Sequence, residues 1–519
     1  MNAIGFKNFR RFKDMPPIML GGVNMFVGGN NAGKSTVVKG ILLLLDFLQY
    51  KKVSSSESPR FCFDGPGSHD VNIDTFNRAR CQYSEVRDIE FNAQINEFTV
   101  EVCIYRARDA KKEDVSYADV KYITLIDSQT NIRLDFDIAS SKATVTILSA
   151  TSETDSIRVE IEKGKSDLEE LQRRQATLAH KSNLYKEEVQ ELLEIRQSIK
   201  RVETMLSGMQ KLSMVMGEKK VTVPLLDGLW DNCTYISNYI HGLVEPRTSS
   251  IDESKSDSSE RKKLIPYQNT LLDIDSRFGK AVSSVRLEYV YSHDAGQRVL
   301  YNKKDENDYV SKSIHEFYNQ RITSKTKLGK EMKSCLSDFC GVDDYRVENI
   351  NGEAYRFTLK VDGKWVDLAD MGRGTIQLST LLVRIFSIIQ KYSNEDRKLS
   401  HVVIVLVEEP EQNLHPALQS KLTDLFYSVY KDYGIRFIIE THSEYMVRET
   451  QIKVAKLKYG DESELTSKNP FAVYYFPSSG NPYNMGYSLK GGFIKNFGTG
   501  FFDKATLLQL ELMKVGKEE

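Results

Sequence analysis

The chain has 519 residues, with 71 Lys and Arg against 72 Asp and Glu, so its formal net charge is −1. This balance excludes a protein that works as one large polycation, although it is compatible with a local basic patch. With 40% hydrophobic and 28% charged residues, the composition is that of a soluble folded protein and excludes a disordered one. No apolar run reaches the ~18 residues of a membrane-spanning helix, and no secretory signal is recognisable.

Six cysteines are scattered along the chain without a CxxC pair. Such spacing in a chain of this length is typical of reduced thiols, not of a disulfide framework. We therefore expect a cytoplasmic protein without a membrane partner. The cysteines are Cys62, Cys81, Cys103, Cys233, Cys335 and Cys340.

The N-terminal segment predicts a strand, a turn, a second strand, a glycine loop and a helix. Strand character covers residues 4–9 and 18–27, and an apolar helix is expected over 35–50. Residues 51–80 are rich in Ser, Gly and Pro and are expected to form a long loop. Several β-type runs between 85 and 161 then predict an inserted antiparallel sheet.

Residues 161–215 predict a coiled-coil arm. Apolar or aromatic residues recur there at intervals of seven, which keeps one seam on one face of a supercoiled helix. The pattern does not decide between one long helix and a hairpin, nor between a projecting coiled coil and an arm packed on its own chain. The seam consists of Leu171, Leu178, Tyr185, Leu192, Ile199 and Leu206.

The remaining chain divides into two parts. Residues 216–345 predict a helical and mixed middle region, with a mobile Ser- and charge-rich loop at 247–263. A second α/β block is expected over 346–519. Together with residues 1–160, this block would form one split unit around the middle of the chain.

The sequence Gly28-Gly29-Asn30-Asn31-Ala32-Gly33-Lys34-Ser35 fits the pattern G-x-x-x-x-G-K-[ST] at every fixed position. Its glycines let backbone N–H groups wrap around phosphate oxygens, and the following helix adds its N-terminal dipole. Lys34 is expected to reach the β- and γ-phosphates, and Ser35 to ligate Mg²⁺. The predicted ATP-binding residues of this loop are Gly28, Asn30, Asn31, Gly33, Lys34, Ser35 and Thr36.

An unbroken apolar run at 402–407 predicts a strand that is buried on both faces of a parallel sheet. It leads directly into Glu408-Glu409-Pro410-Glu411, and nucleotides bind at the carboxyl edge of such sheets. We expect Glu408 to hold the Mg²⁺ shell. Glu409 is expected to orient or deprotonate the attacking water.

A second apolar strand at 436–440 is followed by Thr441-His442-Ser443. Because His442 ends a buried strand next to the predicted site, we expect it to contact the γ-phosphate or the water. Between the two strands, Asn413-Leu414-His415-Pro416 predicts a turn before a helix that begins near Pro416.

Residues 370–377 form another glycine loop, in front of an apolar helix at 378–389. A loop at a helix N-terminus is a potential anion site. A simple helix cap explains the same pattern, and the sequence leaves both readings open.

These motifs, in this order, resemble the ATP-binding-cassette ATPases of the SMC, RecF and OLD group. The resemblance is closest to bacterial OLD-like ATPases, many of them subunits of anti-phage systems such as Septu and PARIS. It covers roughly residues 1–160 and 345–519, including the run Gly-Thr-Gly-Phe-Phe-Asp at 498–503. It implies an α/β fold: a P-loop ATPase head with a mixed or parallel sheet, an antiparallel β insertion and an inserted coiled-coil domain.

The resemblance also implies roles for residues. His442 would be the switch histidine, and Gly372 and Gly374 would belong to a signature loop that acts on ATP held by the other protomer of a head-to-tail dimer. Two departures stand out, since Glu408 replaces a common Asp and Gly372 a common Ser. The resemblance does not place the lid glutamine, for which Gln82 is only a guess.

The family includes nucleases with a C-terminal TOPRIM domain. Only 76 residues follow Ser443 here (519 − 443), and no Asp-x-Asp occurs beyond the strand expected at 472–476. We therefore expect an ATPase subunit of a defence complex that controls a separate effector protein, such as a nuclease or toxin. The alternatives are a RecF-like DNA-repair ATPase that acts on DNA, and a scaffold that binds ATP without hydrolysing it.

Overall fold

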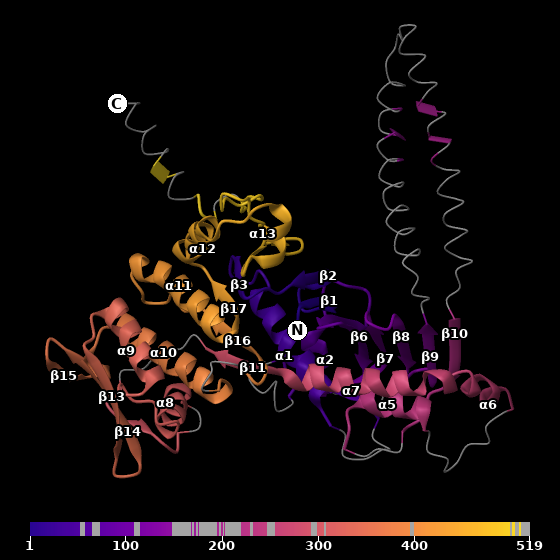
Figure 1. Cartoon of the computed structure of the whole chain (residues 1–519), viewed down its shortest axis with the longest axis horizontal. Helices are drawn as coiled ribbons and strands as arrows, with labels where there is room; N and C mark the ends of the chain where they lie inside the picture. Colours follow the sequence, from indigo (N-terminus) through magenta and orange to yellow (C-terminus); the bar gives the residue numbers. More distant parts are fainter. Residues whose placement is uncertain are drawn as a thin grey trace, which may run out of the picture.

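The computed structural model describes most of the two ends of the chain and parts of its middle. The described residues are 1–51, 58–64, 73–107, 115–147, 219–228, 232–245, 255–291, 298–305, 308–394, 399–498, 501–503 and 508–509, with single positions between 168 and 202. The strands in this part of the chain form three sheets (Figure 1).

The first sheet has nine strands in the order β10-β9-β8-β7-β6-β5-β1-β2, with β4 paired to β7. All of its pairings are antiparallel, as predicted for the β insertion. Alternating burial, for example along β5, shows that one face covers a core. The strands are β1 (Ala3–Phe9), β2 (Phe12–Met19), β4 (Arg60–Cys62), β5 (Ile89–Ile95), β6 (Phe98–Arg106), β7 (Tyr117–Asp127), β8 (Ile132–Asp137), β9 (Lys142–Ile147) and β10 (Lys219–Pro224).

Two predictions for the N-terminal segment were wrong in detail. The apolar run at 18–27 is not one strand, because it breaks at Gly21 and Gly22, where a Cβ on Gly22 would lie 2.4 Å from the ring of Tyr430. The break lets β2 stay in the antiparallel sheet while β3 (Val23–Gly28) enters another sheet. The expected loop at 51–80 contains β4 and α2 (Phe76–Ala79), since Phe61 and Phe76 are buried in the core.

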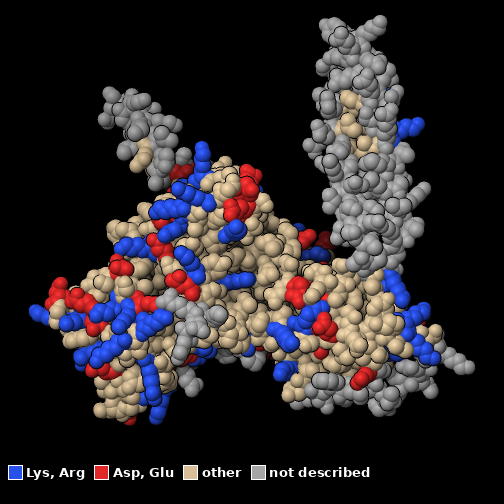
Figure 2. All heavy atoms as spheres, in the orientation of Figure 1, with Lys and Arg blue, Asp and Glu red and all other residues tan. Residues whose placement is uncertain are grey.

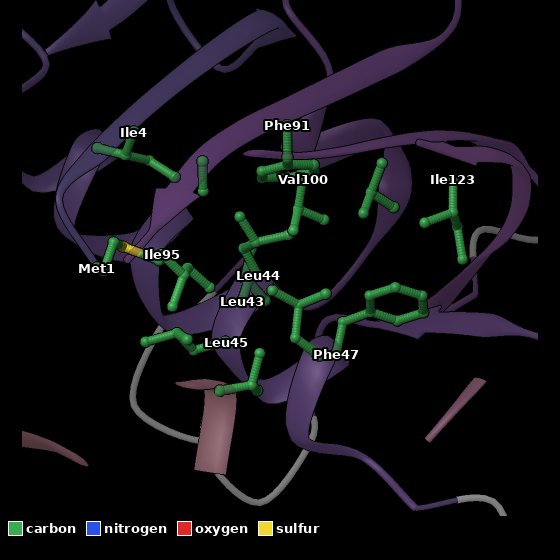
Figure 3. Close-up of a cluster of buried hydrophobic side chains, with 14 of the residues drawn as sticks. Met1, Ile4, Leu43, Leu44, Leu45, Phe47, Phe91, Ile95, Val100 and Ile123 are labelled. Carbon is green, nitrogen blue, oxygen red and sulfur yellow. The ribbon is translucent and has the colours of Figure 1, made fainter. Parts of the chain in front are cut away.

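Helix α1 (Lys34–Gln49) packs against the antiparallel sheet. Between Val37 and Leu48 almost every residue of this helix is apolar and buried. The helix is therefore covered on most sides. Figure 3 shows Leu43, Leu44 and Phe47 of this helix among side chains of the sheet, such as Phe91 and Val100. This packing fixes the helix that begins at the phosphate loop.

The second sheet has the order β11-β16-β17-β3-β18-β19. Its first five strands are parallel, so their carboxyl ends share one edge, and only β19 runs antiparallel. In register, Glu408 lies beside Glu440, and Thr441 lies beside Val27. The strands are β3, β11 (Val285–Val290), β16 (Val402–Glu408), β17 (Arg436–Thr441), β18 (Phe471–Phe476) and β19 (Tyr483–Asn484).

Both faces of the second sheet are covered. Phe26, Leu406 and Ile438 belong to the core that contains α1 and α7, whereas Val405 and Ile439 belong to a second core with α10 and α11. Such two-sided burial explains the unbroken apolar runs of these strands. The covering helices are α7 (Gln268–Ser284), α10 (Arg373–Tyr392), α11 (Pro416–Tyr433), α12 (Glu444–Leu457) and α13 (Glu462–Lys468).

Residues 216–345 contribute to both sheets, because β10 pairs with β9 and β11 pairs with β16. Helices α5 and α7 lie along the antiparallel sheet (Figure 1). A third sheet has the order β12-β14-β13 with β15 on β14. The further elements are α5 (Tyr235–Val244), α6 (Lys255–Lys262), η2 (Ile265–Tyr267), β12 (Tyr301–Asn302), α8 (Tyr309–Asn319), α9 (Lys327–Cys340), β13 (Asp344–Ile350), β14 (Ala354–Val361), β15 (Lys364–Asp367) and η3 (Leu368–Asp370).

The predicted coiled-coil arm at 161–215 lies almost entirely outside the described residues. The described positions within it are helical: Leu168, Leu171, Gln172, Gln175, Ile195, Arg196, Ile199, Lys200 and Val202. Within the predicted mobile loop at 247–263, the described part includes helix α6. None of the described helices has the length and apolar character needed to cross a bilayer.

The predicted α/β architecture is confirmed, since a mainly parallel sheet is joined to an antiparallel β insertion. The six cysteines, all of them described residues, form no disulfide with one another. On the face drawn in Figure 2, Lys and Arg are mixed with Asp and Glu, which agrees with the net charge of −1.

Candidate nucleotide site

The phosphate loop connects the end of β3 at Gly28 to the first residue of α1, Lys34. Asn31 and Gly33 have positive φ angles of 61° and 99°. A Cβ on Gly33 would lie 2.7 Å from the ring of Phe12, so only glycine fits there without movement. The loop therefore has the tight backbone path that exposes N–H groups to an anion.

Lys34 is buried, and only 6% of it is exposed. Its Nζ donates to the carbonyl oxygens of Gly28 at 3.0 Å and Gly29 at 3.2 Å. Burial lowers the pKa of Lys34, and the carboxylates of Glu440 and Glu409 partly offset this effect. The ammonium group is thus held at the mouth of the loop, where it can exchange carbonyl oxygens for phosphate oxygens.

The hydroxyl of Ser35 donates to Oε2 of Glu440 at 2.8 Å. Glu440 is the penultimate residue of β17 and is 5% exposed. Its second oxygen, Oε1, is buried and has no hydrogen-bond partner among the described residues. Burial raises the pKa of Glu440 to about 7, and Glu408 adds to this while Ser35 acts against it.

Glu408 ends β16, and its Oε1 accepts a hydrogen bond from the hydroxyl of Tyr289 on β11. Burial, followed by the charge of Glu408, raises the pKa of Tyr289 far above its usual value. The tyrosine therefore stays a proton donor and fixes one oxygen of the carboxylate. Its ring lies 4.3 Å from that of Tyr291, measured between centroids.

Glu409 has a φ angle of 38°, which is unusual for a residue with a side chain. Its N–H donates to the carbonyl oxygen of Glu440 at 2.8 Å, which holds the turn in place. The Gln412 amide donates to Oε2 of Glu409. The strained turn thus presents Glu409 at the edge of the sheet.

His442 lies between the phosphate loop and Glu409. Its Nε2 is 3.2 Å from Nζ of Lys34 and 3.6 Å from Oε1 of Glu409. The backbone N–H of His442 donates to Oε1 of the buried Glu411 at 2.6 Å. Burial and then the charge of Lys34 lower the pKa of His442, although Glu409 acts in the opposite direction. The ring is therefore neutral near pH 7 and can accept a hydrogen bond.

A cavity of about 530 Å³ opens beside the phosphate loop. This size falls in the range that a bound nucleotide needs. Five further cations line it, and burial followed by Arg10 lowers the pKa of Lys39. The lining residues outside the loop are Arg10, Arg11, Lys39, Arg78, Arg80, Gln82 and Tyr83.

The structure brings together most of the residues that the motifs predicted. Ser35 meets Glu440, while Lys34, His442 and Glu409 form one connected group. Along the loop, Thr36 donates its N–H to the carbonyl oxygen of Gly33 at 3.1 Å. Asn30 and Asn31 are exposed beside the cavity, and Asn31 lines it.

Gly372 and Gly374 do not line this cavity. Gly372 is the N-cap residue of α10 and makes no side-chain cap. A Cβ on Gly374 would lie 2.7 Å from the carbonyl oxygen of Asn413, so Gly374 lets α10 approach that turn. Their surroundings are thus separate from the phosphate loop of the same chain.

Sequence reasoning missed Glu440 and Tyr289, and it missed the cations Arg10 and Lys39. Glu440 was part of a predicted strand but received no role. A signal was present, because a carboxylate that ends a buried parallel strand beside another such strand must lie at the same sheet edge. Tyr289 had no comparable signal, since no motif marks β11.

The oxygen atoms at this edge fit a hard divalent cation. Mg²⁺ prefers oxygen ligands and is usually bound by one or two carboxylates together with phosphates and water. Within the described residues, no group of three His, Cys, Asp or Glu side chains could hold an ion alone. The predicted ligands Ser35 and Glu408 would supply a hydroxyl and a carboxylate to a site that phosphate oxygens would complete.

A family model described as "AAA ATPase domain" matches residues 1–447. No curated protein matches the chain. Among solved structures, an Smc head bound to the C-terminal winged-helix domain of ScpA shares 12% identity over 86% of this chain and 91% of that chain, with a TM-score of 0.29.

Two further Smc head structures come from archaea. The Pyrococcus furiosus head with an extended coiled coil, bound to the C-terminal domain of ScpA, shares 11% identity over 99% of both chains, with a TM-score of 0.30. The Pyrococcus yayanosii head with a coiled coil and joint shares 10% identity over 94% of this chain and 97% of that chain, with a TM-score of 0.34. These structural similarities are weak. The assignment of this chain to a family therefore rests on the family model alone.

Proposed function

The chain belongs to the AAA ATPase domain family, and on that basis we propose that it binds ATP together with Mg²⁺ and hydrolyses it. One observation carries this proposal. Lys34, His442 and Glu409 form a connected group at the phosphate loop, and Ser35 bonds to a buried carboxylate on the neighbouring strand. A site for structural anion binding alone would need no strained glutamate at its edge.

The residues divide the work of the reaction. Lys34 would leave its carbonyl partners for the β- and γ-phosphates, and the loop N–H groups would stabilise the charge that develops on them. Glu409 would accept a proton from the attacking water or orient it. Neutral His442 would donate or accept at the γ-phosphate while Glu411 holds its backbone. Mg²⁺ bound at Ser35 and Glu408 would neutralise phosphate charge.

We also propose that two copies pair head to tail. Gly372 and Gly374 begin α10 away from their own phosphate loop, so they are available for ATP held by the other copy. Gln82 lines the cavity with Lys34 and Ser35, which supports its proposed place as the lid glutamine. The test of this pairing uses the Glu409→Gln variant, which should keep ATP bound. Its molecular mass in solution is measured at increasing ATP concentrations and should rise to that of a dimer.

At the cellular level, we propose an ATPase subunit of a bacterial anti-phage defence complex that controls a separate effector, such as a nuclease or toxin. The motif order that resembles OLD-like ATPases supports this role. A DNA-repair ATPase is the alternative of another class, and it predicts salt-sensitive DNA binding and DNA-stimulated hydrolysis. The third possibility is a scaffold that binds ATP without hydrolysing it. In that case Glu409→Gln would leave biological activity intact.

The proposed activity is tested with the purified full chain. Release of phosphate from ATP and ATP binding are measured with Mg²⁺, for the natural chain, for Lys34→Ala and for the matched control Lys364→Ala, whose side chain is exposed on β15. Lys34→Ala should abolish binding and hydrolysis, whereas Lys364→Ala should change neither. A folded natural chain that neither binds nor hydrolyses ATP would refute the proposal.

A further inference from the structure

The strand order places a carboxylate between the phosphate loop and Glu408. Strand β17 lies between β3 and β16, and Glu440 is in register with Glu408 on one side and with Phe26 on the other. Strand β17, which pairs with β3, therefore carries Glu440 as its penultimate residue, while Glu408 is one strand further away. The hydrogen bond of 2.8 Å from Ser35 to Glu440 is the direct result.

The second oxygen of Glu440 supplies an independent observation. Glu440 is only 5% exposed, and its Oε1 is buried without a hydrogen-bond partner in the described part of the chain. A buried polar atom without a partner costs free energy, and an ionised one costs more. Glu408 and Glu409 are close enough to add to this cost by repulsion. The charge of Lys34 attracts Glu440, but no described residue bonds to Oε1. This oxygen is therefore open to a bound cation.

We propose that Glu440 holds, together with Ser35 and Glu408, the divalent cation that accompanies the nucleotide. This inference deepens the proposed function, on which it rests because phosphate oxygens would complete the coordination. The competing explanation is that Glu440 stays uncharged and only positions the Ser35 hydroxyl. In the first explanation the negative charge at position 440 strengthens the binding of the cation. In the second explanation it does not.

The test uses Glu440→Gln, which keeps an oxygen to accept from Ser35 but removes the charge. Calorimetry measures how tightly the full chain binds a non-hydrolysable ATP analogue, once with Mg²⁺ and once with EDTA. The natural chain should bind more tightly with Mg²⁺. In Glu440→Gln this gain should fall by about tenfold or more. Affinity in EDTA should stay the same or rise, because one negative charge beside the phosphates is gone.

Glu444→Gln is the matched control, since Glu444 lies at the start of α12 and pairs with Arg448. It should behave like the natural chain in both conditions. Glu440→Asp, which keeps the charge, should retain more of the Mg²⁺ gain than Glu440→Gln. If Glu440→Gln does not fold, the decisive sample is a Glu408→Gln chain labelled with ¹³C-glutamate and loaded with Mn²⁺ and the analogue. Its electron–nuclear double resonance should show a glutamate carboxylate bound to the metal.

Three results would overturn the inference. An unchanged Mg²⁺ gain in Glu440→Gln would mean that position 440 only positions Ser35. An equal loss of affinity in Mg²⁺ and in EDTA would mean a structural role, as would absence of the carboxylate coupling in the labelled sample. If the natural chain bound the analogue in neither condition, the proposed function itself would fail. The three results above leave the proposed function intact.

Discussion

Nζ of Lys34 lies 3.2 Å from Nε2 of His442, so the lysine of the phosphate loop contacts the histidine that follows β17. Because Lys34 is charged, the ring nitrogen accepts, and the histidine is held neutral. The position of His442 is thus coupled to whatever Lys34 binds. When phosphates draw Lys34 away, the histidine loses a partner and becomes free to face the γ-phosphate.

His442→Ala should therefore lower turnover more than ATP affinity. Removal of the ring leaves the phosphate loop and Lys34 in place, but it takes away a contact to the γ-phosphate or the water. We expect kcat to fall by about 10²-fold. Steady-state kinetics and analogue binding check this, with His315→Ala as a control, because His315 lies on α8 and bonds to Tyr355. A loss confined to binding would contradict the assigned role.

Glu409→Gln should bind ATP and hydrolyse it slowly. The amide has nearly the same shape but cannot take a proton from water, so we expect turnover to fall by about 10²- to 10⁴-fold. Radiolabelled nucleotide retained after gel filtration should be ATP and not ADP. Glu462→Gln, on the surface helix α13, serves as the control. Normal turnover in Glu409→Gln would remove Glu409 from the reaction.

Tyr289→Phe should weaken the effect of Mg²⁺ on nucleotide binding. The change deletes only the hydroxyl that fixes Oε1 of Glu408, and a hydrogen bond to a charged group contributes about 1.5–3 kcal/mol. We expect a Mg²⁺-dependent affinity about tenfold lower, with little change in EDTA. Calorimetry provides the readout, and Tyr318→Phe, on α8, provides the comparison. Equal losses in both conditions would assign Tyr289 to packing alone.

Asp127→Asn tests the link between the antiparallel sheet and α7. Burial would raise the pKa of Asp127, but hydrogen bonds from Arg277 at 2.6 Å and from Thr130 hold it below its usual value. A depressed carboxyl pKa stabilises the fold above about pH 3.8, and this contribution is lost as the pH falls through the folded pKa. The variant should lose about 3 kcal/mol at pH 7.

The measurement is urea unfolding at pH 7 and at pH 3. The difference between the natural chain and Asp127→Asn should shrink at the lower pH, because the charge contributes less stability once the pH is below the ordinary pKa of an aspartate. Asp362→Asn is the control, because Asp362 is an exposed turn residue with a φ angle of 49° that asparagine tolerates. A difference that stays constant between the two pH values would mean that the charge of Asp127 contributes nothing.

Contiguous motifs were readable from the sequence because their geometry is local. The phosphate loop of Lys34 and Ser35 is set by glycines within a few residues, and the apolar run before Glu408 has one stable arrangement in a two-sided sheet. The requirement for glycine at position 22 was not readable, because it comes from the ring of Tyr430 on a distant helix.

Contacts between strands that are far apart in the chain could not be predicted from the sequence either. Glu440 and Tyr289 come from strands on opposite sides of β16, and only the order β11-β16-β17-β3 brings them to Glu408 and Ser35. The hydrophobic pattern predicts where each strand lies in the sequence, but not which strands pair with it. Strand order is a property of the whole chain, and it decides which carboxylate meets the serine.

The position of β3 has a consequence for how the chain is made. Its partners are β17 and β18, which follow it by more than four hundred residues, as the pairs Phe437 with Val23 and Phe471 with Val23 show. During synthesis, the phosphate loop leaves the ribosome attached to a strand whose two neighbours do not yet exist. Such late pairing is slow and leaves an apolar edge exposed. The phosphate loop therefore meets the carboxylates of β16 and β17 only after the second half of the chain has been translated.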